Sequence, residues 1–274
     1  MKTTCTICPR ACAIEEDDTG FCRARKNENG QIIDANYGRL TALALDPIEK
    51  KPLARFMPGK MILSAGSFGC NLRCSFCQNS DISMNDGSIA KETVLPQALA
   101  DKAEKLIPQG NIGVAYTYNE PVVGFEYVRD CGEIVHNRGM VNVLVTNGYI
   151  NEAPLIELLR HTDAMNIDLK AFTERFYRMM GGHLDVVKRS IALAAQYCHV
   201  EVTTLIVPGE NDSPAEMDQE AKWLASIDRT IPLHISRFFP RYKMTNAEAT
   251  DPDMLFQLAD VARYHLDYVY TGNV

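Results

Sequence analysis

The sequence lacks the features that mark a membrane protein, a secreted protein or a nucleic-acid-binding protein. No apolar run approaches the roughly 18 residues that a membrane-spanning helix needs. The first residues lead into cysteines and then into the acidic run 15–18, with no apolar core of a signal peptide. A formal net charge of −7 is the opposite of the basic surface that nucleic-acid binding requires. We therefore expect a cytoplasmic protein whose partners include neither a membrane nor a nucleic acid.

Internal repeats and low-complexity tracts are also missing, which excludes repeat architectures and long disordered segments. The 274 residues are 46% apolar and 23% charged, ordinary values for a globular protein. This length fits one large α/β domain, or a main domain with a small appendage.

Cysteine, in contrast, is abundant, and its distribution is uneven. Seven of the nine cysteines fall in two tight clusters, in a chain where we see no secretion signal. Metal binding explains such clusters better than disulfide bonds do. The other two, Cys131 and Cys198, stand alone in helical or strand-like contexts, and we expect them to pack in the core.

The most informative cluster is Cys70-x3-Cys74-x2-Cys77, which follows the apolar run 61–66. Three thiols this close cannot form an unstrained disulfide framework, but their thiolates can bind one iron–sulfur cluster. Three ligands on a [4Fe–4S] cube leave one iron open to a substrate or cofactor. The alternatives are a zinc site or chance spacing.

This spacing resembles the signature of the radical S-adenosylmethionine (SAM) superfamily. The resemblance implies that SAM chelates the open iron through its amino and carboxylate groups. An electron then splits SAM into methionine and a 5′-deoxyadenosyl radical, which abstracts a hydrogen atom. Phe76, directly before the last cysteine, matches the family's aromatic residue that packs on the adenine.

A second ligand set lies near the N-terminus, at Cys5-x2-Cys8-x3-Cys12-x9-Cys22. Four thiolates suit a tetrahedral zinc site or an iron–sulfur centre equally well. Such a closed site has no open position, so its role would be structural or an electron relay. Metal binding would also supply folding free energy to a segment with few core residues.

The hydrophobic pattern predicts alternating strands and helices after residue 60. Strands are expected at 61–66, 112–118, 141–146, 163–169, 200–207 and 231–236, and helices near 92–107, 122–138, 151–161, 184–197, 214–227 and 252–264. Such alternation indicates a parallel sheet with crossover helices, and the family resemblance favours a partial (β/α)6 TIM-like barrel over a doubly wound sheet. We expect a cysteine-rich N-terminal module with a turn at 25–30 and an extended arm at 46–53, together covering 1–58, and a core barrel at 59–274.

Polar residues stand at the predicted strand ends, where the active sites of such barrels lie. Asn119 and Glu120 occupy the place of a Gly-Gly-Glu-Pro-type motif that, in the family, accepts hydrogen bonds from the SAM ammonium. Both glycines are absent here, and Glu120 before Pro121 also fits ordinary helix capping. Asn147 is a candidate contact to the SAM carboxylate or ribose, or part of a turn with Gly148.

The later strand ends resemble those of glycyl-radical-enzyme activases. There the residue matching Asp168 helps to hold a monovalent cation beside SAM, and the one matching Lys170 reaches the cofactor; we take both as the candidate catalytic pair. His234, which we place at the end of the sixth strand, resembles the activase histidine that contacts the SAM ribose. A strand ending in solvent and a satisfied core histidine are the alternatives.

Further segments widen the resemblance to nearly the whole chain. They match the AmmeMemoRadiSam-system radical SAM enzymes, which are often labelled pyruvate formate-lyase activating enzyme-like, at 8–12, 46–53, 69–72, 76–79, 115–121, 211–213 and 270–274. Association with that family suggests Memo-like and AMMECR-type proteins as partners. Flavodoxin or ferredoxin is the expected kind of electron donor.

We therefore expect a radical SAM oxidoreductase with SAM and a [4Fe–4S] cluster as cofactors, a second zinc or iron–sulfur centre, and a monovalent cation. One hypothesis is an activase that takes hydrogen from the backbone of a glycyl-radical enzyme. A second is radical modification of a small molecule or a protein side chain, which the N-terminal cysteines favour. A non-catalytic iron–sulfur redox protein is the third.

Overall fold

The computed structural model describes all residues from 1 to 274, and an eight-stranded sheet organises it. The strand order is β14-β13-β12-β11-β10-β9-β7-β6. All neighbours run parallel except β6, which pairs antiparallel with β7. The bounds are β6 (Ala42–Pro47), β7 (Met61–Gly66), β9 (Asn111–Tyr116), β10 (Val141–Thr146), β11 (Ala164–Asp168), β12 (His199–Ile206), β13 (Leu233–Arg237) and β14 (Val269–Gly272). Because β6 and β14 do not pair, the barrel is open.

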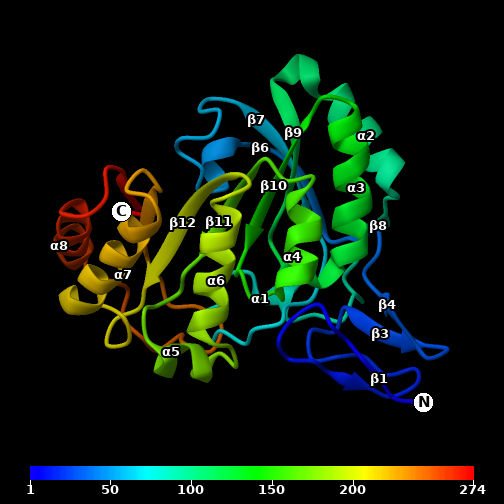
Figure 1. Cartoon of the computed structure of the whole chain (residues 1–274), viewed down its shortest axis with the longest axis horizontal. Helices are drawn as coiled ribbons and strands as arrows, with labels where there is room; N and C mark the ends of the chain where they lie inside the picture. The colour runs from blue at the N-terminus through cyan, green and yellow to red at the C-terminus, as the bar shows by residue number, and fades with distance from the viewer.

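Helices cover the outer face of this sheet, as Figure 1 shows for α2, α3, α4 and α6. They are amphipathic: α3 buries Val128, Cys131 and Val135, which recur at helical spacing. Pro96, Pro214 and Pro252 begin their helices, where the missing N–H costs nothing. The long helices are α2 (Pro96–Lys105), α3 (Phe125–Asn137), α4 (Glu152–Leu159), α6 (Leu184–Ala194), α7 (Pro214–Ile227) and α8 (Pro252–Arg263).

The remaining elements are short. They are α1 (Ser80–Ser83), α5 (Glu174–Met179) and the 3₁₀ turns η1 (Ile48–Lys50), η2 (Ile107–Gln109) and η3 (Pro121–Gly124), together with β1 (Thr3–Thr4), β2 (Ala13–Ile14), β3 (Arg25–Glu28), β4 (Gln31–Asp34), β5 (Arg39–Leu40) and β8 (Glu92–Thr93). In Figure 1 the strands β1, β3 and β4 extend from one end of the barrel, below α3 and α4.

The inner face of the sheet is closed at its amino end by the segment that follows β6. Ile62, Ala115, Val143 and Ala164 come from four neighbouring strands and form one buried cluster with Ile48 and Leu53. The segment is fixed there because the carboxylate of Glu201 accepts hydrogen bonds from the backbone N–H groups of Ala54 and Arg55.

The six predicted parallel strands are confirmed to within two residues, and each predicted helix has a counterpart. Three features differ from the expectations. The turn predicted at 25–30 is mainly strand β3, whose ladder with β4 turns only at Asn29 and Gly30. The seventh parallel strand, β14, was missed. The boundary at residue 58 cuts through the main sheet, since β6 forms a full ladder with β7.

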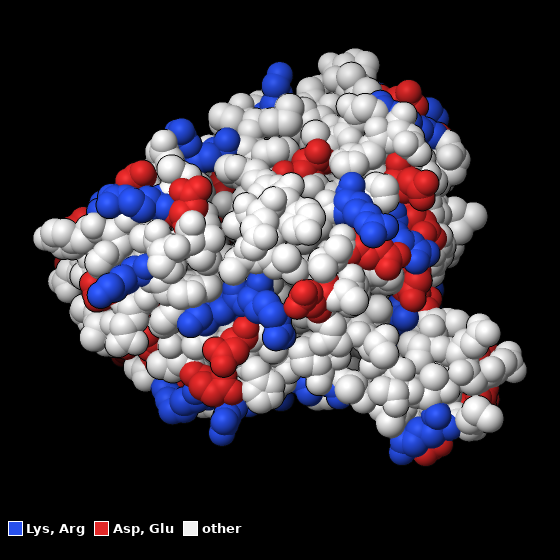
Figure 2. Space-filling model, viewed as in Figure 1, with Lys and Arg blue, Asp and Glu red and all other residues white.

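Charges of both signs alternate over the face drawn in Figure 2, without an extended surface of one sign. No helix is both long and apolar enough to cross a membrane. Cys131 is fully buried against the core, and Cys198 packs against it partly buried, as predicted.

Candidate functional site

The loop after β7 carries Cys70, Cys74 and Cys77 at the carboxyl end of the sheet. Cys70 and Cys74 are buried, and Cys77 is partly exposed. Polar groups approach the sulfurs: the N–H of Leu72 lies 3.4 Å from the Cys70 sulfur, and the Ser83 hydroxyl lies 3.1 Å from that of Cys77. Donors of this kind stabilise thiolates and cluster sulfurs. The donor set therefore fits an iron–sulfur cluster with three protein ligands.

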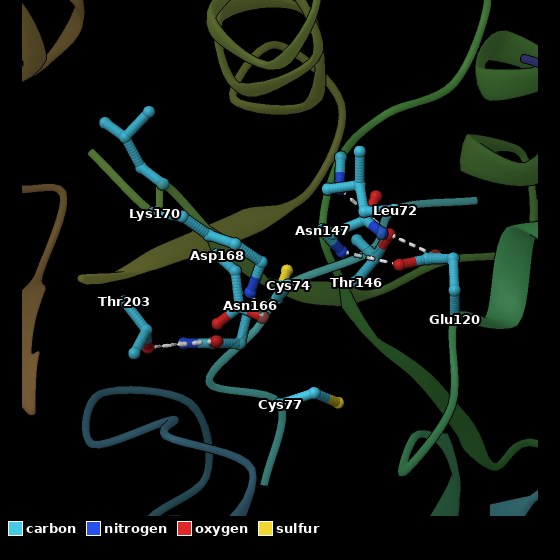
Figure 3. A network of polar contacts seen from close by, with 12 residues as sticks. Leu72, Cys74, Cys77, Glu120, Thr146, Asn147, Asn166, Asp168, Lys170 and Thr203 are labelled. Atoms are coloured by element: carbon cyan, nitrogen blue, oxygen red, sulfur yellow. Dashed lines mark hydrogen bonds and ion pairs between the residues drawn. The ribbon is translucent and has the colours of Figure 1, made fainter. Parts of the chain in front are cut away.

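A partly buried charge pair stands beside this loop. The ammonium of Lys170 lies 2.9 Å from the carboxylate of Asp168, at the end of β11. Burial lowers the pKa of Lys170, but the charges of Asp168 and Cys74 outweigh it, so the net shift is upward and the side chain stays charged. Burial raises the pKa of Cys74 to about 11, although Lys170 opposes this shift. Figure 3 shows this pair on one side of Cys74 and Glu120 with Asn147 on the other.

Glu120 joins two strand ends across the site. Its carboxylate accepts hydrogen bonds from the Thr146 hydroxyl at 2.6 Å and from the N–H groups of Asn147 at 2.7 Å and Val122 at 3.2 Å. Burial raises the pKa of Glu120 to about 7, although these hydrogen bonds lower it. In this arrangement Glu120 also caps η3, the capping role that was the alternative to binding SAM.

Asn119 serves the cysteine loop. Its side-chain oxygen accepts from the N–H of Ser67, and its nitrogen donates to the carbonyls of Phe68, Gly69 and Glu120. Its preceding neighbour Tyr118 has a φ of 70°, in the left-handed region. The amide of Asn119 thus orders the start of the loop, and a direct contact with SAM stays a prediction.

Asn147 reaches the cysteine loop from the end of β10. Its side-chain nitrogen lies 3.0 Å from the Asn71 side-chain oxygen and 3.6 Å from the Cys70 sulfur. Its own oxygen accepts from the N–H of Tyr149, which closes the turn predicted around Gly148. The predicted turn is therefore present, and contact of Asn147 with the SAM carboxylate or ribose stays a prediction.

Phe76 and His234 have different surroundings from those predicted. Phe76 is buried and stacks on Phe176 of α5, with ring centroids 5.6 Å apart. His234 is the second residue of β13, not its last, so its predicted place was wrong. Its Nε2 lies 2.6 Å from the carboxylate of Glu201, and its ring stacks on Tyr270. His234 therefore faces the closed amino end of the barrel; contact with SAM stays a prediction for both residues.

Two buried glutamates that the sequence motifs do not reveal hold parts of the barrel together. Glu201, on β12, holds both His199 and His234 and the closing segment at 54–55. Glu220, on α7, contacts the Thr204 hydroxyl, which donates to the carbonyl of Leu169 between Asp168 and Lys170. A charged residue inside an otherwise apolar helix face or strand was the available signal.

The four N-terminal cysteines lie around one pocket, and a metal centre there stays a prediction. Cys5, Cys8, Cys12 and Cys22 line one pocket, which Asn71 of the cysteine loop also lines. Nowhere in the chain do three or more His, Cys, Asp or Glu side chains converge tightly enough to hold one metal ion. This holds for the Cys70 loop and for the N-terminal pocket alike.

Comparison with known proteins identifies the class. Residues 66–221 match the Radical SAM superfamily. The chain is 39% identical over 277 residues to an uncharacterized protein of Methanocaldococcus jannaschii, a match that covers 100% of this chain and 82% of that one. It is 25% identical over 177 residues to the pyruvate formate-lyase 1-activating enzyme of Escherichia coli K12, covering 61% of this chain and 71% of the enzyme.

Solved structures share the fold at low sequence identity. A domain of pyruvate-formate lyase-activating enzyme from Bacteroides vulgatus has a TM-score of 0.51 at 16% identity, covering 59% of this chain and 99% of that chain. SuiB from Streptococcus suis, bound to S-adenosylmethionine, has a TM-score of 0.58 at 11% identity, covering 78% of this chain and 52% of SuiB. The chain belongs to the radical SAM superfamily. Within it, the pyruvate formate-lyase activating enzymes are distant homologues.

Proposed function

We propose that this protein is a radical SAM oxidoreductase whose catalytic [4Fe–4S] cluster is held by Cys70, Cys74 and Cys77. The observation that carries the proposal is the position of these thiols, on the loop after the first parallel strand, with Lys170 and Asn147 against them. When bound and reduced, the cluster would supply the electron that splits SAM into methionine and a 5′-deoxyadenosyl radical.

The residues around the loop have separate tasks in this proposal. Lys170 and Asp168 form the charged wall beside Cys74, where Lys170 can donate hydrogen bonds to SAM and Asp168 can take a ribose hydroxyl or a monovalent cation. Glu120 and Asn147 form the opposite wall and accept from the SAM ammonium or donate to its carboxylate. Phe76 supplies an apolar face for the adenine, and His234 remains a candidate for the ribose.

The reaction after SAM cleavage is hydrogen abstraction from a substrate. We propose an activase-like role, in which the hydrogen comes from the backbone of a glycyl-radical enzyme, because several distant relatives are pyruvate formate-lyase activating enzymes. The alternative is modification of a small molecule or a protein side chain, which the four-cysteine pocket favours. Memo-like and AMMECR-type proteins, and a flavodoxin or ferredoxin as reductant, are proposed partners in the cytoplasm.

The test is SAM cleavage by anaerobically reconstituted protein with a strong reductant, followed by chromatography for 5′-deoxyadenosine. Cys74→Ala should abolish the product while the circular dichroism spectrum stays native. Cys198→Ala, which changes a cysteine away from both clusters, is the matched control and should retain full cleavage. Product from Cys74→Ala would overturn the assignment of the cluster ligands.

The activase role has its own test. The reduced protein, SAM and a glycyl-radical enzyme are mixed, and the glycyl radical is sought as an EPR doublet. Appearance of the doublet supports the activase role. Active SAM cleavage without a doublet across several such enzymes would favour the alternative substrates.

A further inference from the structure

Thiols, two arginines and the apolar side chains of Ile7, Ile14 and Val123 line the N-terminal pocket. Cys5, Cys8, Cys12 and Cys22 line it, with no histidine and no carboxylate among the lining residues. Cys5 and Cys22 are buried, and Arg10 and Arg25 line the same pocket. Four thiolates and nearby positive charge match the ligand set of an iron–sulfur cluster.

Arg25 carries a second and independent signal. Its side chain is only 4% exposed, and its two terminal nitrogens are held by the carboxylate of Glu126. Its Nε–H has no hydrogen-bond partner although it is buried. A buried unpaired donor of a guanidinium is costly, and an anionic group in the pocket would satisfy it.

The arrangement of the sulfurs indicates the kind of metal centre. In a polynuclear cluster each thiolate binds a different iron, so the sulfurs stand further apart than four ligands of one zinc ion do. The four N-terminal thiols line one pocket, and no three of them are placed to bind a single metal ion.

We propose that Cys5, Cys8, Cys12 and Cys22 hold a second iron–sulfur cluster, with Arg25 Nε–H as a donor toward it. All four ligands are thiolates, so this cluster has no open iron for SAM. The second cluster would therefore differ from the one at the Cys70 loop, which has an open iron.

The pocket also braces the catalytic loop. Arg10 donates to the carbonyl of Asn71 at 2.6 Å and to that of Gly181 at 2.5 Å. Arg73 donates to the carbonyls of Phe21 and Cys70, and its guanidinium lies 3.9 Å from the centroid of the Phe21 ring. The side chain of Asn71 lines the pocket and meets Asn147. The ligand loops of the two sites thus share hydrogen bonds.

Close packing confirms that the two loops must fit together. A side chain at Gly69, which precedes the first catalytic cysteine, would place its Cβ 2.5 Å from the carbonyl oxygen of Cys22. No such contact is tolerated against backbone, and Gly69 also has a φ of +91°. The N-terminal module therefore lies directly on the start of the catalytic loop.

The test removes one ligand set from the full-length protein at a time. With Cys70, Cys74 and Cys77 all changed to Ala, the anaerobically reconstituted protein should retain about four iron and four sulfide ions per chain, with the broad visible absorption of a cluster. Stoichiometric zinc without iron and sulfide, or no metal, would overturn the proposal. Circular dichroism and thermal unfolding show whether this variant is folded.

A second variant covers the case in which the first one does not fold. Cys5→Ala with Cys22→Ala should lower the iron content of the otherwise natural protein by about half, whereas Cys131→Ala with Cys198→Ala, as matched control, should not change it. Unchanged iron in the first of these pairs would also refute the second cluster.

The brace is tested through Arg10→Ala, with Arg138→Ala on the outer surface as control. Loss of the two hydrogen bonds to Asn71 and Gly181 should make a chelator release iron from the Cys70 loop about fivefold faster or more, because two net hydrogen bonds together contribute about 1–3 kcal/mol. Equal release from both variants would refute the brace. The release experiment rests on the proposed cluster at the Cys70 loop. Because iron release is measured without SAM, its result can be interpreted even if the protein does not cleave SAM.

Discussion

Glu220 should make the stability of this protein depend on pH in a way that a single substitution removes. The Glu220 side chain is buried, and burial raises its pKa to about 8, although a hydrogen bond with Thr204 opposes the shift. The Thr204 hydroxyl has one proton and lies within reach of both Glu220 and the carbonyl of Leu169. If that proton goes to Leu169, Glu220 must itself be protonated and donate to Thr204.

The sign follows from the two pKa values of Glu220. An acid with a folded pKa of about 8 and an ordinary value of 4.5 binds more protons when folded. Its contribution to stability is therefore complete below pH 4.5 and is lost as the pH rises through 8. Between pH 5 and pH 8 the loss is about 3.5 kcal/mol, from 1.36 kcal/mol for each pKa unit.

The assay is urea unfolding of the metal-free protein between pH 5 and pH 9, for the natural protein and for Glu220→Gln. The glutamine amide can donate to Thr204 at every pH, so the variant should lack this pH dependence and be the more stable of the two at pH 9. Glu220→Ala loses the donor and should be less stable than Glu220→Gln throughout. Parallel pH profiles for the natural protein and Glu220→Gln would refute the protonated carboxyl.

Three further predictions concern the site and the closed end of the barrel. Lys170→Met should leave Asp168 without its partner and raise the KM for SAM about tenfold or more, since a hydrogen bond to a charged group is worth about 1.5–3 kcal/mol. An unchanged KM in the kinetics of SAM cleavage would show that Lys170 does not contact the cofactor. Glu201→Ala should cost about 2–6 kcal/mol in urea unfolding, because the buried carboxylate takes part in four hydrogen bonds that are worth about 0.5–1.5 kcal/mol each. His234→Asn should cost less because only one partner of Glu201 is lost, and the reverse order would contradict this network. Burial would raise the pKa of Glu201, but the hydrogen bonds of His199 and His234 outweigh it and lower the pKa to about 2. The contribution of Glu201 to the stability of the fold is therefore complete above pH 4.5 and should be lost as the pH drops toward 2. Glu201→Gln should lack this acid transition.

Much of the fold could be predicted because apolar runs alternate regularly with amphipathic segments. Helix α7 matches the predicted 214–227 without error, since Ser213 and Pro214 mark its start. Strand β6 was missed because it is an edge strand whose buried and exposed residues do not alternate regularly. Pro47 and Pro52 made the same segment look like an extended arm.

The candidate site was predictable where short motifs carry the chemistry. The loop at Cys70 and the pair Asp168 and Lys170 lie together as expected. The position of His234 was not predictable, because strand β13 begins two residues later than the apolar run does and the histidine lies near the start of the strand. Glu201 and Glu220 act through residues of other strands and helices, and such partners cannot be read from local sequence.

The contacts of Arg10 have a consequence for the order of folding. They join residue 10 to Asn71 and to Gly181, separations of 61 and 171 positions along the chain. Contacts between residues so far apart close large loops of chain and form late, because that loss of entropy must be met before they stabilise anything. The catalytic loop can therefore reach its final shape only when the first and the middle parts of the polypeptide have met. During synthesis, a ribosome that has made only the first half of the chain holds a polypeptide in which the contact between Arg10 and Gly181 is still missing.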